Sequence, residues 1–150
     1  MSCRNRLLIV SCGATKCPDE EPLPAIERYN GPFYTTLRKF LAEHPAERGR
    51  LSIMVLSAEY GLINGYRLIP DYDHLMTPER AVWLHPQVSR RLATLLQHQR
   101  FTSTFINLGR TYMGAFTIEP MLVPLLGDIT EATGGIGQKR GQMRRWLEAP

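Results

Sequence analysis

The sequence predicts a single α/β domain of three layers, in which helices cover both faces of a mostly parallel, Rossmann-like sheet. Three short apolar runs rich in β-branched residues, at residues 6–11, 52–56 and 104–108, have the length and composition of buried strands. Segments with apolar residues at helical spacing lie between them. A chain of 150 residues is the size of one ordinary domain, so residues 1–150 are predicted to share one core.

The first strand and the second are predicted to be joined by a helix. A polar, proline-containing connection at residues 18–24 follows the first strand. Gly31 and Pro32 then interrupt the chain, and the apolar residues of 33–44 recur at helical spacing. The second strand comes next and ends abruptly in polar and aromatic residues.

The second half of the chain begins with a long predicted helix at residues 77–100. Thr77 is a suitable N-cap, and Pro78 is at the first helical position. After the third strand, residues 113–118 are predicted to begin a helix that Pro120 cuts short. The apolar residues 121–126 then form either a short fourth strand or a helix.

The charge and hydropathy of the chain favour a soluble protein with an anionic ligand. The formal net charge is +4, with a basic cluster near the C-terminus and an acidic patch at residues 19–21. This pattern suits phosphate-bearing ligands or nucleic acid, and it equally suits a solvated helix face. No apolar run approaches the length of a membrane span, and residues 7–10 are too short for a signal peptide. We therefore predict a cytoplasmic protein without a membrane partner.

The cysteines predict neither a disulfide framework nor a zinc site. Cys3, Cys12 and Cys17 are an odd number crowded into the first 17 residues, and no second Cys or His cluster supplies zinc-ligand spacing. No metal and no cofactor are predicted. Cys12 follows the first strand directly, so it is either a reactive thiol or a packed small residue.

Polar clusters follow all three predicted strands. The loop at residues 11–16 has the composition of an anion cradle, but it lacks the glycine spacing of a Walker A loop, so hydrolysis of nucleoside triphosphates is not indicated. The carboxyl ends of parallel strands lie on one edge of a sheet, where ligands bind. One cleft is therefore predicted to gather Ser11, Cys12, Lys16, Ser57, Tyr60, Tyr72, Asp73, Arg110, Tyr112 and Gln138.

A glycine-rich loop at residues 133–138 opens a basic helix predicted at 139–147. Free N–H groups at a helix N-terminus attract anions, so Gly135 and Gly137 are candidate phosphate-binding residues. The basic side chains of this helix are candidate nucleic-acid contacts, namely Lys139, Arg140, Arg144 and Arg145.

The segments SCGATK, ERYNGPFY, LSAEYGLI, IPDYD, LGRTYM and GGIGQKRGQMRRWL occur in this order between residues 6 and 147. Together they resemble an uncharacterised bacterial and phage family related to the YaaA peroxide-stress proteins. They are more remotely similar to the domain found with archaeosine synthase. The family usually has proline directly before the tyrosine of the fourth motif, whereas here Asp71 separates Pro70 from Tyr72. The resemblance implies DNA binding and protection against oxidative damage, or chemistry on bases and nucleosides.

Two functions remain open from the sequence. The first is an enzyme that acts on a nucleobase, nucleoside or modified nucleic acid, at the glycosidic bond or by base transfer. Asp73 is its first catalytic candidate, Cys12 is a less favoured nucleophile, and Tyr72 completes the catalytic set. Substrate or phosphate binding is assigned to Ser11, Lys16, Tyr29, Ser57, Tyr60, Gly61, Arg110, Tyr112, Gly135, Gly137 and Gln138.

The alternative is a non-catalytic DNA-binding protein of oxidative stress that uses the basic helix. Each candidate residue also has a structural explanation. Tyr60 and Tyr72 are alternatively core aromatics, and Asp73 is alternatively a turn cap.

Overall fold

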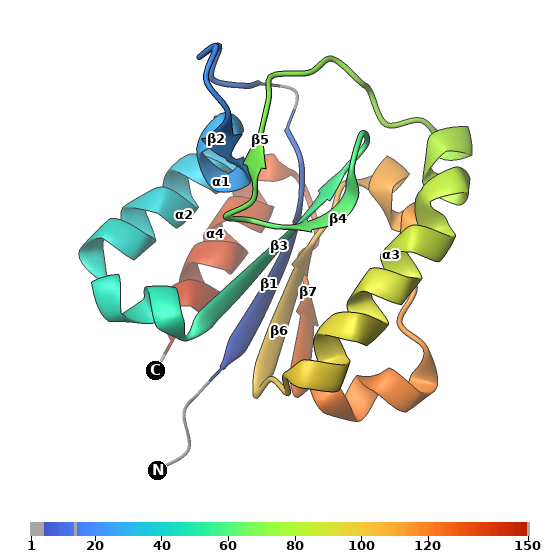
Figure 1. Ribbon diagram of the computed structural model, residues 1–150. Coiled ribbons are helices and arrows are strands. Elements are labelled where there is room, and N and C mark those ends of the chain that lie inside the picture. Colours follow the sequence, from blue (N-terminus) through green and yellow to red (C-terminus); the bar gives the residue numbers. More distant parts are fainter. Residues whose placement is uncertain (1–4, 14, 150) are drawn as a thin grey trace.

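The computed structural model, which describes residues 5–13 and 15–149, contains a five-stranded sheet in the order β4-β3-β1-β6-β7. Four of the strands are parallel, and only the edge strand β4 runs antiparallel to its neighbour β3 (Figure 1). The mostly parallel sheet predicted from the sequence is confirmed. Its strands are β1 (Arg6–Ser11), β3 (Leu51–Ser57), β4 (Gly61–Asn64), β6 (Ser103–Asn107) and β7 (Asp128–Glu131).

Helices cover both faces of this sheet, as predicted. Figure 1 shows α1, α2 and α4 on one side and α3 on the other. A small ribbon of two strands, β2 and β5, lies beside α1. The bounds are β2 (Leu23–Pro24), α1 (Ala25–Arg28), α2 (Pro32–Glu43), β5 (Leu68–Ile69), α3 (Pro78–His98) and α4 (Ile136–Glu148), with the 3-10 helices η1 (Pro45–Gly49), η2 (Arg110–Ala115) and η3 (Pro120–Leu126).

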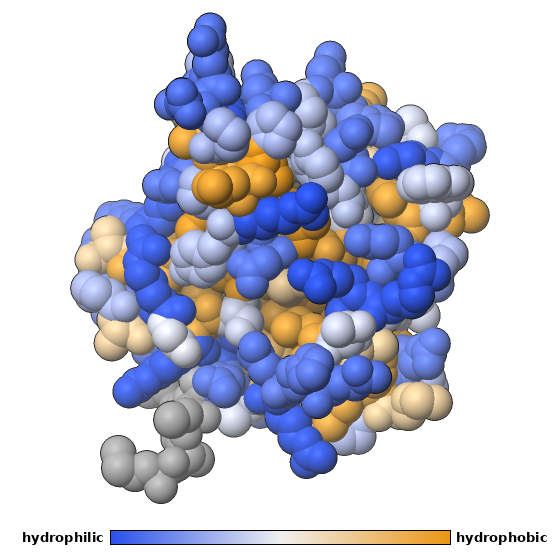
Figure 2. Space-filling model, in the orientation of Figure 1, coloured by the Kyte–Doolittle hydropathy of each residue, from blue (hydrophilic) through white to orange (hydrophobic). Residues whose placement is uncertain are grey.

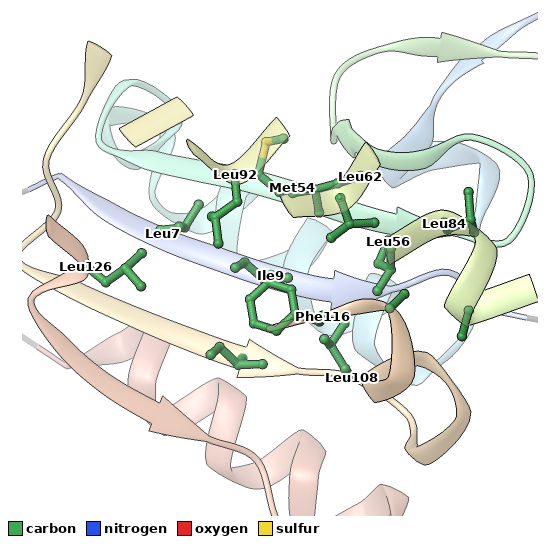
Figure 3. Close-up of a cluster of buried hydrophobic side chains, with 14 of the residues drawn as sticks. Leu7, Ile9, Met54, Leu56, Leu62, Leu84, Leu92, Leu108, Phe116 and Leu126 are labelled. Carbon is green, nitrogen blue, oxygen red and sulfur yellow. The ribbon is translucent and has the colours of Figure 1, made fainter. Parts of the chain in front are cut away.

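Each face of the sheet has its own buried core because successive strand residues point to opposite sides. Leu7 and Ile9 of β1 pack with α3 in the cluster of Figure 3. Leu8 and Val10 of the same strand pack on the other face, with residues of α2 and α4. This two-sided burial explains why β1 is a continuous apolar run rather than an alternating one.

The surface is mostly hydrophilic on the side shown in Figure 2, with exposed hydrophobic side chains over α1 and the β2–β5 ribbon. Leu68 of β5 is 62% exposed, while its neighbour Ile69 is buried. The strand β5 therefore covers the core with Ile69 and presents Leu68 to solvent. Within the described part of the chain, no helix is both long and apolar enough to span a membrane.

The order of the strands creates a topological switch point between β1 and β6. The chain leaves β1 toward β3 on one side, and it leaves β6 toward β7 on the other side. Connections that diverge in this way leave a crevice outside the carboxyl ends of the two strands, where open α/β sheets bind ligands. In Figure 1 these ends point to the top of the molecule.

Four strands were not predicted, namely β2, β4, β5 and β7. Gly61 has φ 74°, so the chain reverses within a few residues of β3 and returns as β4 directly after the polar and aromatic residues that end β3. The β7 sequence DITE is short, polar and wholly exposed, so it carries little strand signal. Residues 121–126 are helical, one of the two alternatives left open, and α3 continues through Pro86.

Candidate functional site

The loops that follow β1 and β6 touch at the switch point. The Cys12 Sγ and the Tyr112 hydroxyl are 2.9 Å apart and form a hydrogen bond. Close by, the Gly109 amide donates to the Ser11 hydroxyl at 3.3 Å. Cys12 is buried, and its amide donates to the Leu56 carbonyl, which extends the β1–β3 ladder by one residue. A thiol and a phenol thus meet where the fold places ligands.

A chain of hydroxyl groups begins at the end of β3. The fully buried Ser57 hydroxyl accepts hydrogen bonds from the amides of Glu59 at 3.1 Å and Tyr60 at 3.2 Å. These bonds occupy its lone pairs, so its proton is directed at the Tyr72 hydroxyl, 2.9 Å away. The Tyr72 hydroxyl is in turn hydrogen-bonded to the Tyr29 hydroxyl. The buried Ser57 therefore donates to Tyr72, which fixes the direction of hydrogen bonding at the β3 end of this series of hydroxyl groups.

Lys16 and Tyr60 both contact the Tyr72 ring. The Lys16 Nζ is 4.6 Å from the centre of that ring, a cation–π contact, and the Tyr60 ring meets it edge-on at 5.4 Å. Lys16 is also held by a backbone bridge to Tyr29. The Arg67 guanidinium lies 5.1 Å from the centre of the Tyr60 ring. Cationic and aromatic groups from four segments are thereby joined.

Burial raises the pKa of four tyrosines well above the ordinary value. Electrostatic repulsion between a phenolate and the nearby Cys12 sulfur raises the pKa of each further. At neutral pH these hydroxyls are protonated and act as hydrogen-bond donors. The four residues are Tyr29, Tyr34, Tyr72 and Tyr112.

We call the residues joined by these contacts the strand-end cluster. Tyr34 supports it from α2, because its hydroxyl donates to the Ser11 carbonyl at 2.8 Å and its ring lies 5.2 Å from that of Tyr29. The members of the cluster are Ser11, Cys12, Lys16, Tyr29, Ser57, Tyr60, Tyr72 and Tyr112.

Arg28 holds a loop of the strand-end cluster in place through buried hydrogen bonds. It is completely buried, and its two terminal nitrogens donate to the carbonyls of Cys17, Asp19, Glu21 and Ile69 at 2.7–3.3 Å. The guanidinium therefore ties the loop between β1 and β2 to β5. That loop carries Lys16, so the position of Lys16 depends on the buried positive charge of Arg28.

Residues 7–148 match a family of unknown function, DUF6884. The chain belongs to this family. A search of curated proteins found no match. The relationship to YaaA-like proteins stays a prediction.

The predicted site residues Asp73, Arg110 and Gly61 lie outside the strand-end cluster. Asp73 is exposed, and its side chain has no hydrogen bond with any residue in the described ranges. Arg110 is exposed at the start of η2, where it lines a hollow of about 270 Å³ with Lys139. Gly61 serves the turn, since a Cβ there would lie 2.1 Å from the Gln87 Oε1. The structure thus joins Cys12 and Tyr72 but leaves their predicted catalytic partner at the surface.

The glycine-rich loop is closed by glutamines of its own helix. The Gly135 amide donates to the Gln138 Oε1 at 3.0 Å, and the Thr133 amide donates to the Gln142 Oε1 at 2.9 Å. Gly137 is exposed in the first turn of α4. No hydrogen bond among the described residues joins these predicted phosphate-binding groups to the strand-end cluster.

The four basic residues predicted to bind nucleic acid face different parts of the molecule. The Lys139 Nζ donates to a carbonyl at the end of β6 at 3.4 Å. Arg140 and Arg144 line a groove of about 340 Å³ between α2 and α4. Arg145 borders the glycine-rich loop. They are therefore divided among three surroundings on α4.

The described residues contain no group of three or more His, Cys, Asp or Glu side chains arranged to hold a metal ion. The strand-end cluster itself offers hydroxyl, thiol and ammonium groups.

Two residues beside the cluster were missed by sequence reasoning. The His74 Nδ1 and the Glu59 Oε2 are 2.5 Å apart. Glu59 lies inside the motif LSAEYGLI, two residues after Ser57, and His74 directly follows the motif IPDYD, two residues after Tyr72. That equal spacing was the available signal, but it acquires meaning only once Ser57 and Tyr72 are known to touch.

Proposed function

We propose that this chain is an enzyme that acts on a nucleobase, a nucleoside or a modified nucleic acid, by cleaving the glycosidic bond or transferring the base. The observation that carries the proposal is the hydrogen bond between Cys12 and Tyr112 beside the switch point of the sheet, with Tyr72 packed against the same core cluster as both. Ligands of open α/β sheets bind at this position.

The chemistry of the strand-end cluster suits a flat ligand rich in hydrogen-bond acceptors. Tyrosine hydroxyls of ordinary or raised pKa are protonated at neutral pH, and those of Tyr72 and Tyr112, which are only partly buried, can donate to the carbonyl oxygens and ring nitrogens of a base. Tyrosine rings also offer faces and edges on which a base can stack. Lys16 adds one positive charge for a phosphate or for an electron-rich ring substituent.

We assign proton donation to the leaving base to Tyr72 and nucleophilic attack on the sugar to Cys12. As the glycosidic C–N bond breaks, its electron pair passes to the base nitrogen, which takes the proton of the Tyr72 hydroxyl. The Cys12 thiol attacks the anomeric carbon and forms a C–S bond, and its own proton passes to the Tyr72 oxygen, which restores that hydroxyl. Water, which gives up one proton as it attacks, or an incoming base then displaces the sulfur, which leaves as a thiolate. Cys12 is favoured over Asp73 as the nucleophile because its side chain lies within the cluster.

The proposal is tested by incubating the protein with nucleosides, nucleotides, DNA and tRNA and measuring released or exchanged base by chromatography. Cys12→Ser and Tyr72→Phe should each lower turnover by at least about 100-fold. Cys17→Ser and Tyr66→Phe are matched controls, since neither residue belongs to the cluster, and they should keep wild-type rates. Asp73→Asn should retain most of the activity.

Thermal-shift measurements with the same compounds separate binding from catalysis. A nucleoside that raises the melting temperature of wild type should also raise that of Cys12→Ser. Full activity in Cys12→Ser and Tyr72→Phe would refute the assigned roles. The absence of both binding and turnover with every nucleobase-containing compound would refute the substrate class.

A further inference from the structure

Glu59 and His74 form a polar pair that no step above uses. The His74 Nδ1 and the Glu59 Oε2 are 2.5 Å apart, and their side chains are 35% and 42% exposed. The pair lies on two segments that already touch, the turn between β3 and β4 and the loop before α3. It is therefore partly open to solvent while being attached to the strand-end cluster.

The pair repeats the Ser57–Tyr72 contact one step further out. Ser57 bonds to Tyr72, and the residues two positions later on each segment, Glu59 and His74, bond to each other. The inner bridge consists of partly buried hydroxyls and the outer bridge consists of a carboxylate and an imidazole. The carboxylate and the imidazole are therefore each two residues along their segment from the contact that joins Ser57 to Tyr72.

Both segments are fixed by the first turn of α3. The Arg80 Nε and Nη2 donate to the carbonyls of Ala58 at 2.8 Å and Glu59 at 3.1 Å. The Arg80 amide donates to the Thr77 hydroxyl, which caps the helix at the end of the loop that carries His74. One residue therefore holds the turn and the end of the loop, so the carboxylate and the imidazole are brought together by the backbone.

We propose that Glu59 and His74 are the general acid–base pair of the proposed reaction, with Glu59 orienting the imidazole and His74 exchanging a proton with the substrate or the attacking water. The inference rests on the proposed function. A carboxylate bound at Nδ1 keeps a proton on that nitrogen and leaves Nε2 as the basic one. During hydrolysis the His74 Nε2 takes one proton from a water molecule while the oxygen of that water bonds to the anomeric carbon. The C–S bond to Cys12 breaks in the same step, and its electron pair remains on the sulfur, which leaves as a thiolate.

The catalytic role is tested by steady-state kinetics of His74→Gln and Glu59→Gln on the base-release reaction. His74→Gln should lower kcat by at least about 100-fold, the size of general acid–base effects. Glu59→Gln should lower it by a smaller factor, and the double variant should be no worse than His74→Gln because the two residues act as a unit. KM and the ligand-induced thermal shift should stay close to wild type. His98→Gln, at the far end of α3, is the matched control.

A second measurement needs no substrate. In ¹⁵N-correlated NMR spectra of the wild-type protein above the titration range of imidazole, His74 should show the tautomer with the proton on Nδ1, and Glu59→Gln should reduce it. The opposite tautomer in wild type would refute the pair even if turnover is found. Normal kcat in His74→Gln would refute the catalytic role while the proposed function stands. If wild type releases no base from any compound, the proposed reaction and the catalytic role both fail, and the NMR result alone decides whether the pair exists.

Discussion

The strand-end cluster and the start of α4 have similar compositions, but the fold uses them differently. Both combine hydroxyl or amide groups with basic residues, and both were predicted to bind an anion. In the cluster, side chains from four segments bond to one another, as Ser57 does to Tyr72 and Cys12 to Tyr112. At α4, the loop amides of Thr133 and Gly135 are satisfied by glutamines of the same helix. Composition is therefore a weaker guide than convergence of distant segments.

The largest effect on stability is expected from Arg28→Met. The substitution leaves the carbonyls that bind the buried guanidinium without donors, and we expect a loss of about 4 kcal/mol in the free energy of unfolding, at the high end for single substitutions. Urea denaturation measures it. Arg145→Met, beside the glycine-rich loop, is the control and should change stability by less than about 0.5 kcal/mol. Equal effects of the two substitutions would remove the contrast between the regions.

Alkaline pH should destabilise the cluster next most strongly. Burial raises the pKa of Tyr29 and Tyr34 in the folded state. The free energy of unfolding that their protonated hydroxyls contribute is therefore intact below the tyrosine pKa of the unfolded state, near 10, and is lost as the pH rises above that value. Together these two buried groups should cost roughly 3 kcal/mol for each pH unit above about 10. Tyr72 and Tyr112 are partly exposed and should add less, because solvent screens them.

Urea denaturation of wild type and Tyr34→Phe at several alkaline pH values measures this loss. The variant should lose stability with a slope shallower by roughly 1.4 kcal/mol per pH unit, because it has one fewer buried group to ionise. Parallel curves for the two proteins would contradict the link between burial and the tyrosine hydroxyls.

A smaller loss is expected from Ser57→Ala. Removing the buried hydroxyl leaves two amides and the Tyr72 hydroxyl with one partner fewer, which should cost about 2 kcal/mol. Thr133→Ala is the matched control in the exposed loop and should cost less than about 0.5 kcal/mol. A Ser57→Ala protein as stable as wild type would show that the hydroxyl chain is not a stabilising network.

The smallest effect should come from neutralising the basic residues of α4. Replacing Lys139, Arg140, Arg144 and Arg145 by glutamine should change the affinity for duplex DNA by less than about threefold, since these side chains do not share one surface. Gel retardation at several salt concentrations measures it. A steep loss of binding, with a clearly reduced salt dependence, would instead favour the alternative of a DNA-binding protein.

Local patterns in the sequence determined the strands β1, β3 and β6, the helices α2, α3 and α4, and the fold class. These elements have a strong apolar period, or a clear N-cap such as Thr77, and both are properties of neighbouring residues. The same patterns placed Cys12, Ser57 and Tyr112 at or just after strand ends. They could not reveal β7, whose four exposed residues carry almost no hydrophobic signal.

Only the tertiary structure decided which of these residues meet. Tyr72 reaches Ser57 and Tyr29, while its neighbour Asp73 faces solvent, although both stood together in the sequence-based site. The Glu59–His74 pair likewise exists only because the β3–β4 turn and the loop before α3 lie side by side. Hydrophobic periodicity specifies an element and its buried face, whereas a contact between distant segments depends on strand order and loop path, which no local pattern encodes.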